Sequence, residues 1–323
     1  MRTSEQVLAV CLVVAQAALG ASPIAFNRIP SVVIFRGDPT FAYRDPAAFY
    51  HQGTFHLFYS LMEVEPDGKD YWYTASSTST DLIHWTPPKK LTPRDRNLNF
   101  SSPGNVVRFG GKFVLSLQTY PTPNGEVFGN DTARVWTMRS SDLEHWDKPE
   151  MLMVKGPAVP VDKMGRMIDP FLLEDKDEPG KWWCFYKQNG VSMSWSRDLR
   201  TWTYAGHANA GENVCVLVEG NEYILFHSPR NGIGVKRSRD LKEWRDEALL
   251  TLGQKDWSWA QRRLTAGFVL DMRQEPGVGR YLMFFHGDSG EGPKTHEAHG
   301  QGTLGLAWSD DLRHWDWPGK TKQ

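Results

Sequence analysis

Cysteine is scarce in this chain, with only three among 323 residues. So few thiols exclude a disulfide-dense scaffold, and no Cys or His spacing in the sequence is typical of a zinc or iron site. Cys184 and Cys215 lie within apolar, strand-like runs, WWCFY and NVCVLV. A free cysteine packs in such a run as a small hydrophobe. We therefore expect both thiols to be buried and unpaired.

An excess of charge of either sign is also absent. Lys and Arg number 37 and Asp and Glu number 38, which gives a formal net charge of −1. This balance offers no basic surface for nucleic acid or for an anionic membrane. We therefore expect neither nucleic acid nor a membrane among the partners. Composition leaves the oligomeric state open.

Long apolar runs are missing outside the N-terminus. Residues 7–19 are apolar apart from Gln16, a basic residue precedes them, and small residues follow. The run is too short for a confident membrane span, and its layout is that of a signal peptide. We predict that residues 1–20 are a signal peptide and that the mature protein is secreted or periplasmic.

A seven-residue pattern, S-x-D-L-x-x-W, occurs five times. The copies are STDLIHW (79–85), SSDLEHW (140–146), SRDLRTW (196–202), SRDLKEW (238–244) and SDDLRHW (309–315). The Trp residues are separated by 61, 56, 42 and 71 residues. Periods in this range are typical of solenoids and propellers.

The segments between the copies are short, strand-like runs, and long helical periodicity is absent. In the first unit the runs are PAAFYH (46–51), TFHLFYSL (54–61), YWYTASS (71–77) and HWT (84–86). Most of the 29 Gly and 20 Pro residues fall between such runs, where turns require them. Four strands repeated five times predict an all-β fold, a five-bladed β-propeller of four-stranded antiparallel blades, as one domain over residues 21–323. Residues 31–36 are expected to add a strand that seals the ring.

The repeated pattern has a structural role in such a fold. Its Asp can accept backbone N–H groups in the turn between the third and fourth strands, and its Leu and Trp can bury against the adjacent blade. These five Asp and Trp residues are therefore expected to be scaffold, and chemistry must lie elsewhere.

The inner strands begin near the propeller axis, so their first residues should converge. Aligned on the repeat, they open with Asp45-Pro46, Ser102-Pro103, Asp169-Pro170, Glu212-Asn213 and Thr265-Ala266. Three of the five openings carry a carboxylate. Carboxylates gathered in one funnel repel one another and lose hydration, which costs stability. Function explains such a cluster better than folding does.

The second strands return to the same face and end in polar residues. These are Ser60, Gln118, Lys187, Ser228 and His286, and they are expected to ring the same pocket. Loops that follow these strands should form its walls, and two of them, 119–131 and 287–302, are long. The second contains His296 and His299, for which a solvated loop is the preferred interpretation over a metal or ligand site.

Glycoside hydrolysis uses a pair of carboxyl groups, one ionised to activate water or attack carbon, and one protonated to donate to the leaving oxygen. A third carboxylate nearby can raise the pKa of the acid. The predicted rim offers three such groups.

The openings Tyr43-Arg44-Asp45-Pro46, Ile168-Asp169-Pro170 and Gly211-Glu212 resemble those of the five-bladed glycosidases of glycoside hydrolase family 43 and its relatives, families 32, 62 and 117. The resemblance implies that Asp45 is the general base or nucleophile, Asp169 the pKa modulator and Glu212 the general acid. It also implies an inverting reaction.

The chain departs from each family at particular positions. Asn213-Val214 follows Glu212 where family 43 has Gly-Pro, and Cys215 lies three residues after Glu212 where family 32 has a Glu-Cys pair. A His acts as the acid in some family 117 relatives, so His227 or His286 remains an alternative proton donor. We favour Glu212, because it opens its inner strand as the two Asp residues open theirs.

Further residues are candidates for binding a sugar. Arginines and polar groups can hold hydroxyls, and aromatic faces can stack on sugar rings. The candidates are Phe41, Arg44, Trp72, Ser102, Tyr120, Lys187, Arg230 and His286.

The sequence thus predicts a secreted glycoside hydrolase that removes terminal sugars from a plant or algal carbohydrate. An arabinofuranosidase, a xylosidase and an anhydrogalactosidase all fit. Two alternatives stay open: a sugar-binding propeller without catalysis, and a glycoside phosphorylase with Lys187 and Arg230 at a phosphate site. We expect no cofactor and no metal in the catalytic site; a structural calcium ion on the axis is not assignable from sequence.

Overall fold

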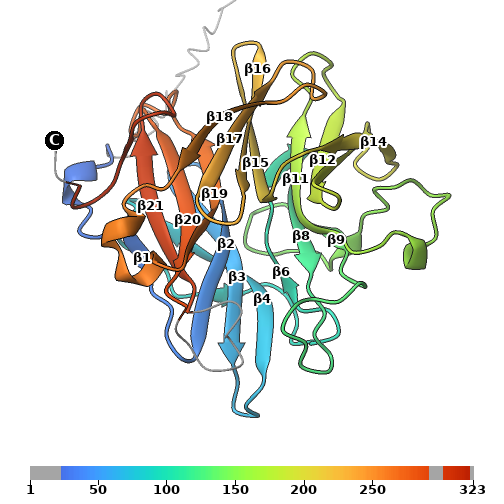
Figure 1. Cartoon of the computed structure of the whole chain (residues 1–323), viewed down its shortest axis with the longest axis horizontal. Coiled ribbons are helices and arrows are strands. Elements are labelled where there is room, and N and C mark those ends of the chain that lie inside the picture. The colour runs from blue at the N-terminus through green and yellow to red at the C-terminus, as the bar shows by residue number, and fades with distance from the viewer. Residues whose placement is uncertain (1–22, 291–300, 321–323) are drawn as a thin grey trace, which may run out of the picture.

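The computed structural model describes residues 23–290 and 301–320, and within them the protein is built from strands, turns and four short 3-10 helices. Five antiparallel sheets are arranged around a common centre (Figure 1). The fold is therefore the expected five-bladed β-propeller. The predicted signal peptide lies outside the described residues, as do His296 and His299.

Each sheet is one blade, and its strands follow outward in chain order, except that the N-terminal strand β1 joins the outer side of the last blade. The first blade comprises β2 (Phe41–His51), β3 (Thr54–Val64), β4 (Asp70–Ser79) and β5 (Lys89–Lys90). The second comprises β6 (Phe100–Ser101), β7 (Val106–Phe109), β8 (Lys112–Thr119), β9 (Val135–Ser140) and β10 (Glu150–Met151). The third comprises β11 (Ile168–Glu174), β12 (Trp182–Lys187), β13 (Val191–Ser196) and β14 (Thr203–Ala208).

The fourth blade comprises β15 (Glu212–Glu219), β16 (Glu222–Ser228), β17 (Ile233–Ser238) and β18 (Arg245–Leu250). The fifth comprises β19 (Arg263–Asp271), β20 (Tyr281–Asp288), β21 (Thr303–Ser309), β22 (Trp315–Asp316) and β1 (Val33–Phe35). The 3-10 helices are η1 (Phe26–Arg28), η2 (Val161–Lys163), η3 (Gln254–Asp256) and η4 (Ser258–Ala260).

The N-terminal strand closes the ring. β1 pairs antiparallel with β21 of the last blade, with Val33 opposite Gly305. The prediction of a sealing strand in residues 31–36 is therefore confirmed. The last blade contains strands from both ends of the described chain, so the ring cannot open without breaking a sheet. β1 also covers part of the edge of β21 that would otherwise be unpaired.

The repeated S-x-D-L-x-x-W pattern forms a turn cap in each blade, as predicted. In the first copy, Asp81 Oδ1 accepts the N–H groups of Ile83 and His84, each at 2.8 Å, and Ser79 Oγ accepts the N–H of Leu82 at 2.9 Å. The Leu of every copy has a left-handed backbone, with φ between 54° and 67°. A bulky residue rarely adopts this conformation, so the side-chain hydrogen bonds hold a strained turn.

The Leu and Trp of the pattern anchor the turn to the core. All five Leu residues are buried. The ring of Trp146 packs edge-on against Phe58 of the preceding blade, with centroids 5.7 Å apart. One detail of the prediction is wrong: the fourth strand of the first blade is residues 89–90, not HWT. Thr86 N does donate to Thr78 O of β4 at 3.0 Å, but the strand that pairs with β4 is formed at residues 89–90, opposite Ser76 and Ala75.

Replacing the Asp of a turn cap should lower the free energy of unfolding, by an amount that does not depend on the caps of other blades. We expect Asp81→Ala and Asp198→Ala each to lower the unfolding free energy by about 1 kcal/mol, because two backbone N–H groups lose a charged acceptor. The two Asp residues belong to blades that are not neighbours, so the double variant should show nearly the sum. Urea denaturation near neutral pH measures this.

Glu243→Ala is a matched control, because Glu243 lies within a repeat but is exposed. Its effect should stay within about 0.5 kcal/mol. The hydrogen bonds also lower the pKa of Asp81 and Asp198, so the losses should shrink as the pH falls below about 4, where the unfolded chain becomes protonated. A strongly non-additive double variant would contradict the picture of independent turns.

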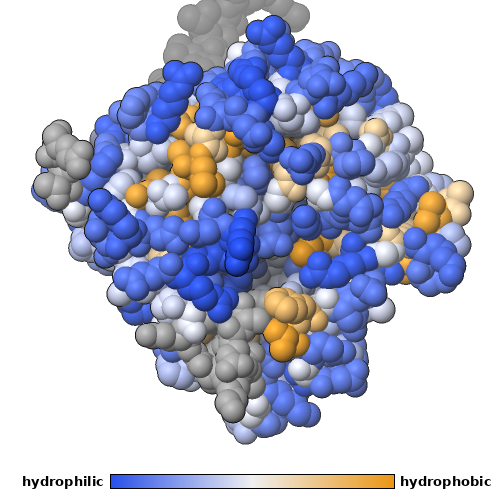
Figure 2. Space-filling model, viewed as in Figure 1, coloured by the Kyte–Doolittle hydropathy of each residue, from blue (hydrophilic) through white to orange (hydrophobic). Residues whose placement is uncertain are grey.

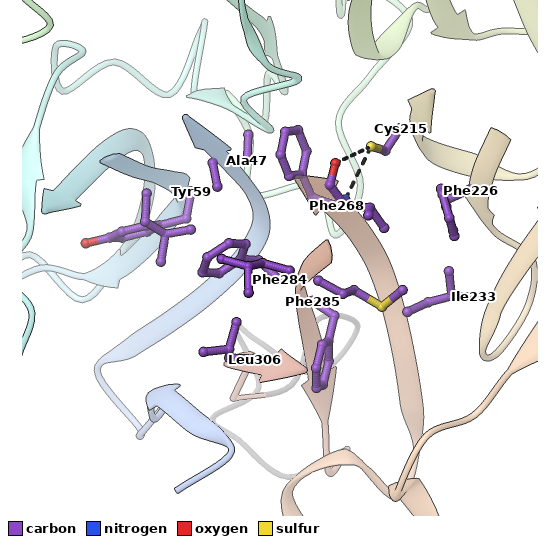
Figure 3. Packing of buried hydrophobic residues seen from close by; sticks show 14 of the residues in the cluster. Ala47, Tyr59, Cys215, Phe226, Ile233, Phe268, Phe284, Phe285 and Leu306 are labelled. Carbon is purple, nitrogen blue, oxygen red and sulfur yellow. Dashed lines mark hydrogen bonds between the residues drawn. The ribbon is translucent and has the colours of Figure 1, made fainter. Parts of the chain in front are cut away.

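The core lies between the blades and is rich in aromatic residues. Tyr59, Phe226, Phe284 and Phe285 are fully buried, and Figure 3 shows them packed with aliphatic side chains from neighbouring sheets. Cys215 lies in this core, where its Sγ accepts the N–H of Val269 at 3.3 Å.

Both cysteines within the described residues are buried and free, as expected. Burial raises the pKa of the Cys215 thiol to about 12 and raises that of Cys184 further. Neither is therefore reactive as a thiolate near neutral pH.

The surface in Figure 2 is mainly hydrophilic, with apolar residues in small patches. None of the helices formed by residues 23–290 and 301–320 is long and apolar enough to cross a membrane.

Candidate active site

The five inner strands share one unusual backbone feature at the propeller axis. Each has a residue with φ between 42° and 53°, in the left-handed region. These residues are Asp45, Ser102, Asp169, Asn213 and Ala266. In the four blades with a continuous inner strand, the pairing with the second strand shifts register here, as at a β-bulge. Bulges and left-handed non-glycine residues commonly occur next to active sites, where they redirect side chains.

This register corrects the alignment on which Glu212 was chosen. The fourth-blade equivalent of Asp45 and Asp169 is Asn213, and Glu212 comes one residue earlier, at the position of Arg44. Our reason for favouring Glu212, an equivalent opening position, is therefore wrong. Its residue type still matters, because Glu212 lines the same pocket as both Asp residues.

The polar residues that end the second strands bond to the backbone of the next blade, and most of them do not line the pocket. Ser102 N donates to Ser60 Oγ at 2.7 Å, and Asp169 N donates to Gln118 Oε1 at 2.6 Å. The same bond joins Ala266 N to Ser228 Oγ and Asp45 N to His286 Nδ1. These residues were expected to ring the pocket; within the described chain, only Gln118 among them lines it.

The fourth blade breaks this pattern for a chemical reason. The corresponding residue of the third blade is Lys187, whose ammonium cannot accept a hydrogen bond. Asn213 N donates instead to Asp169 Oδ2 at 3.3 Å. The Asp169 carboxylate thus replaces a missing acceptor and is held in place by the backbone of the next blade.

Asn213 also joins the two Asp residues. Its Nδ2 donates to Asp45 Oδ1 at 3.2 Å and to Asp169 Oδ1 at 3.1 Å. Ser60 Oγ donates to Asp45 Oδ2 at 2.9 Å, and Ser102 Oγ donates to Asp169 Oδ1 at 2.6 Å. Carboxylates from the first and third blades therefore lie side by side. Asp45 is oriented by Ser60 of its own blade and Asn213 of the fourth, and Asp169 is oriented by Ser102 of the second blade and Asn213.

A pocket of about 150 Å³ opens above this pair. Its lining residues are Arg44, Asp45, Trp72, Gln118, Tyr120, Phe128, Arg166, Ile168, Asp169, Glu212, Asn213 and Arg263. Glu212 is 32% exposed, and Arg263 Nη2 donates to its Oε1 at 2.6 Å. A narrow channel of about 20 Å³, room for roughly one water molecule, continues below along the axis.

The sugar-binding candidates divide into two groups. Arg44, Trp72 and Tyr120 line the pocket, with the Trp72 and Tyr120 rings 5.2 Å apart. Ser102 and His286 instead bond to the two Asp residues: Ser102 Oγ donates to the Asp169 carboxylate, and His286 Nδ1 accepts the backbone N–H of Asp45.

Phe41, Lys187 and Arg230 do not line this pocket in the described part of the chain. Phe41 packs against the core at the start of β2. Arg230 is exposed in the loop after β16.

The pocket also contains residues that were not site candidates from the sequence, among them Phe128, Arg166, Asn213 and Arg263. Arg166 and Arg263 each precede the left-handed residue of their blade by three positions. When the five units are aligned on the left-handed residue, two arginines fall at the same position. This coincidence could have marked both as candidates from the sequence.

Burial and mutual repulsion change the proton affinity of the pair. Desolvation, followed by the charges of Glu212 and Asp45, raises the pKa of Asp169 to about 7. Desolvation also raises the pKa of Asp45, against the opposing effect of Arg44. Perturbed carboxyl groups in a pocket are typical of functional sites.

The raised pKa of Asp169 predicts a pH-dependent stability. The unfolded chain releases this proton near pH 4 and the folded protein near pH 7, so the folded state binds more protons between these values. The unfolding free energy should therefore fall as the pH rises through this window. Asp169→Asn should make the fall smaller, as urea denaturation at about pH 5 and pH 8 would show.

The comparison with a variant is needed because His227 acts in the opposite direction. Burial lowers the pKa of His227 to about 4, so its contribution to stability rises with pH up to about 6.5. Asp147→Asn, at a side chain that is 65% exposed, is the control. An unchanged pH dependence in Asp169→Asn would contradict the assigned proton.

Residues 23–290 and 301–320 contain no group of three or more His, Cys, Asp and Glu side chains that could hold a metal ion. This finding does not test the axial calcium ion considered from the sequence, which could bind through water.

The fold and this pocket define the class of protein: a five-bladed propeller glycoside hydrolase with its acids at the axis. Residues 43–227 match the model of the glycosyl hydrolases family 32 N-terminal domain, and the chain belongs to that family. A curated protein of Psychromonas ingrahamii described as "Probable sucrose-6-phosphate hydrolase" is 32% identical over 178 residues. That match covers 50% of this chain but only 29% of the relative's length.

Solved structures share the fold at low identity. The catalytic domain of the Coprinopsis cinerea GH62 α-L-arabinofuranosidase has a TM-score of 0.58 and 16% identity, covering 86% of this chain and 97% of that one. A thermostable family-43 glycoside hydrolase has a TM-score of 0.57 and 13% identity, covering 89% and 97%. The family resemblance expected from the sequence is thereby confirmed.

Proposed function

We propose that this protein hydrolyses the glycosidic bond of a terminal sugar, with Asp45 as general base or nucleophile, Glu212 as general acid and Asp169 as modulator. One observation carries the proposal: a single Asn213 amide contacts both Asp carboxylates on the floor of a pocket whose wall contains Glu212.

The environment of each carboxyl group suits its proposed role. Burial raises the pKa of Asp45, and Arg44 and the hydrogen bond from Ser60 oppose that rise and so support the ionised form needed to act on carbon or water. Asp169 retains its proton up to about pH 7, because its raised pKa follows from burial beside two other acids. A neutral Asp169 leaves Asp45 as the charge on the pocket floor.

Arg263 fixes the position of the Glu212 side chain. Its Nη2 donates to Oε1 at 2.6 Å, so in this proposal Oε2 is the atom that transfers the proton to the leaving oxygen. Glu212 is more exposed than the two Asp residues, as an acid that must be reprotonated from solvent in each cycle requires. His227 and His286 do not line the pocket in the described part of the chain, and each uses Nδ1 to accept a backbone N–H.

The size of the pocket favours a terminal sugar over a continuous chain. Its volume of about 150 Å³ lies below the range of about 300–1,000 Å³ usual for drug-sized ligands. The channel beneath it holds only about one water molecule, so a substrate must enter and leave by the same opening.

The sugar is a proposal drawn from the resemblance and the relatives. Arabinofuranosides and xylosides follow from the family 43 and 62 likeness, and sucrose and its 6-phosphate follow from the name of the Psychromonas ingrahamii relative. We further propose that the protein acts outside the cytoplasm, because of the signal-peptide pattern of residues 1–20.

The first test is a screen of wild-type protein against nitrophenyl glycosides, plant and algal oligosaccharides, sucrose and sucrose 6-phosphate. We expect release of one monosaccharide from one class of substrate. Following the anomer by NMR tests the predicted inversion, because a retaining enzyme releases the opposite anomer first. Turnover that required added phosphate would favour the phosphorylase alternative; its candidate residues Lys187 and Arg230 do not line the pocket in the described chain.

A further inference from the structure

The wall of the pocket contains Arg166, an arginine whose backbone is fixed by side chains from other segments. Arg166 lies in the segment between η2 and β11. Gln188 Nε2 donates to the carbonyls of Met164 and Arg166, at 3.0 and 2.9 Å, and Arg134 Nη1 donates to Gly165 O at 2.9 Å. Two side chains from other segments thus hold the three residues around Arg166, although they form no strand or helix.

The Arg166 side chain is positioned as well. Its Nε donates to Gly129 O at 3.0 Å, and its guanidinium lies 5.4 Å from the centroid of the Tyr120 ring. Gly129 is packed so closely on Tyr120 that a Cβ there would come within 2.7 Å of the ring. These contacts use Nε and leave the two terminal nitrogens of the guanidinium for a ligand in the pocket.

The charge of Arg166 is not matched by an acid. Arg263 is paired with Glu212, and Arg44 lies near Asp45 and Asp288. Arg166 forms no ion pair within residues 23–290 and 301–320. The arginines whose charges act most strongly on Asp45 are Arg44 and Arg263.

We propose that Arg166 binds an anionic substituent of the substrate, so that the pocket selects a sugar carrying a carboxylate, sulfate or phosphate group over its neutral counterpart. The two terminal nitrogens of the guanidinium carry four N–H groups in one plane, which match the oxygens of such groups. The inference rests on the proposed function only in taking the ligand to be a sugar.

The test measures binding to wild-type protein, because monosaccharides bind without being cleaved. Calorimetry compares glucose with glucuronate, glucose 6-sulfate and glucose 6-phosphate, and inorganic sulfate and phosphate are titrated alone. We expect at least one acidic sugar to bind about tenfold or more tightly than glucose. That preference should weaken as NaCl is raised, whereas the glucose affinity should not change. The three acidic sugars distinguish which anionic group is selected.

Arg166→Gln should abolish the preference for the acidic sugar over glucose, and Arg166→Lys should restore part of it. Arg200→Gln, at an exposed arginine of the repeat in the same blade, is the matched control. Equal affinities for neutral and acidic sugars, a preference that survives Arg166→Gln, or no binding of any anion would each overturn the inference. The wild-type salt dependence provides the test if a variant does not fold.

The two proposals fail separately. If no glycoside is hydrolysed but the Arg166-dependent preference holds, the proposed function is wrong and the anion site stands. If neutral glycosides are hydrolysed and acidic sugars bind no better than glucose, only the anion site is wrong.

Discussion

Asp45→Asn should reduce turnover by about 10³-fold or more while the protein remains folded. An amide cannot act as a base or nucleophile, but it has nearly the same shape and can still accept a hydrogen bond from Asn213 or Ser60. Initial rates on the best substrate of the screen give the loss, and circular dichroism and thermal unfolding check the fold. Asp147→Asn, on the surface, should retain wild-type rates.

Glu212→Gln should show a different pattern, which separates the acid from the base. Protonation matters most when the leaving group is basic. The loss should therefore be large for natural glycosides or alkyl glycosides and small for dinitrophenyl glycosides, whose leaving group needs no proton. Asp45→Asn should be equally poor on both. Near-wild-type turnover by Asp45→Asn, or the opposite dependence on the leaving group, would refute the assigned roles.

Gly104→Ala should have the largest effect on stability, about 3 kcal/mol or more, or should prevent folding. Gly104 lies in the second blade beside the axis, and a Cβ there would overlap the carbonyl oxygen of Pro170 in the third blade and come within 2.6 Å of Ser116 Oγ. The carbonyl is backbone and follows Asp169 directly, so the clash can be relieved only by moving one blade against the next. Soluble yield and urea denaturation measure the outcome.

Gly110→Ala is the matched control for this change. Gly110 has φ +57°, so alanine is strained there, but nothing lies within 4 Å of its added Cβ. We expect a loss of about 1 kcal/mol, the usual cost of the backbone conformation alone. If Gly104→Ala were no worse than Gly110→Ala, the close approach of the two blades at the axis would be disproved.

Much of the fold could be predicted because the repeated turn is held by hydrogen bonds between residues close in the sequence. Asp81 and Ser79 make the turn with atoms no more than three residues away, so the same residues appear at the same spacing in every blade. Five copies then count the blades, and the strand-like runs between them define the sheet. The fourth strand of the first blade was misplaced because it is formed by Lys89 and Lys90, two exposed residues that no local pattern marks as a strand.

The site could be predicted only in part. Asp45 and Asp169 each precede a proline at the start of an apolar strand, which the sequence shows directly. The role of Asn213 could not be predicted, because it depends on a register shift that places Asn213, not Glu212, beside the two Asp residues. Lys187 was assigned to the pocket by position, although its inability to accept a hydrogen bond is what brings Asn213 N to Asp169.

The sequence by itself determined the class of fold, the number of blades and the two carboxylates on the axis, because each follows from contacts between residues close in the chain. Tertiary structure alone decided which groups meet above them. Arg166 is held at the pocket by its bonds to Gln188 and Gly129, and Glu212 accepts a hydrogen bond from Arg263 of the next blade. The physical reason is that blades pack through side chains whose register depends on bulges and neighbouring sheets, and no spacing along one chain records that geometry.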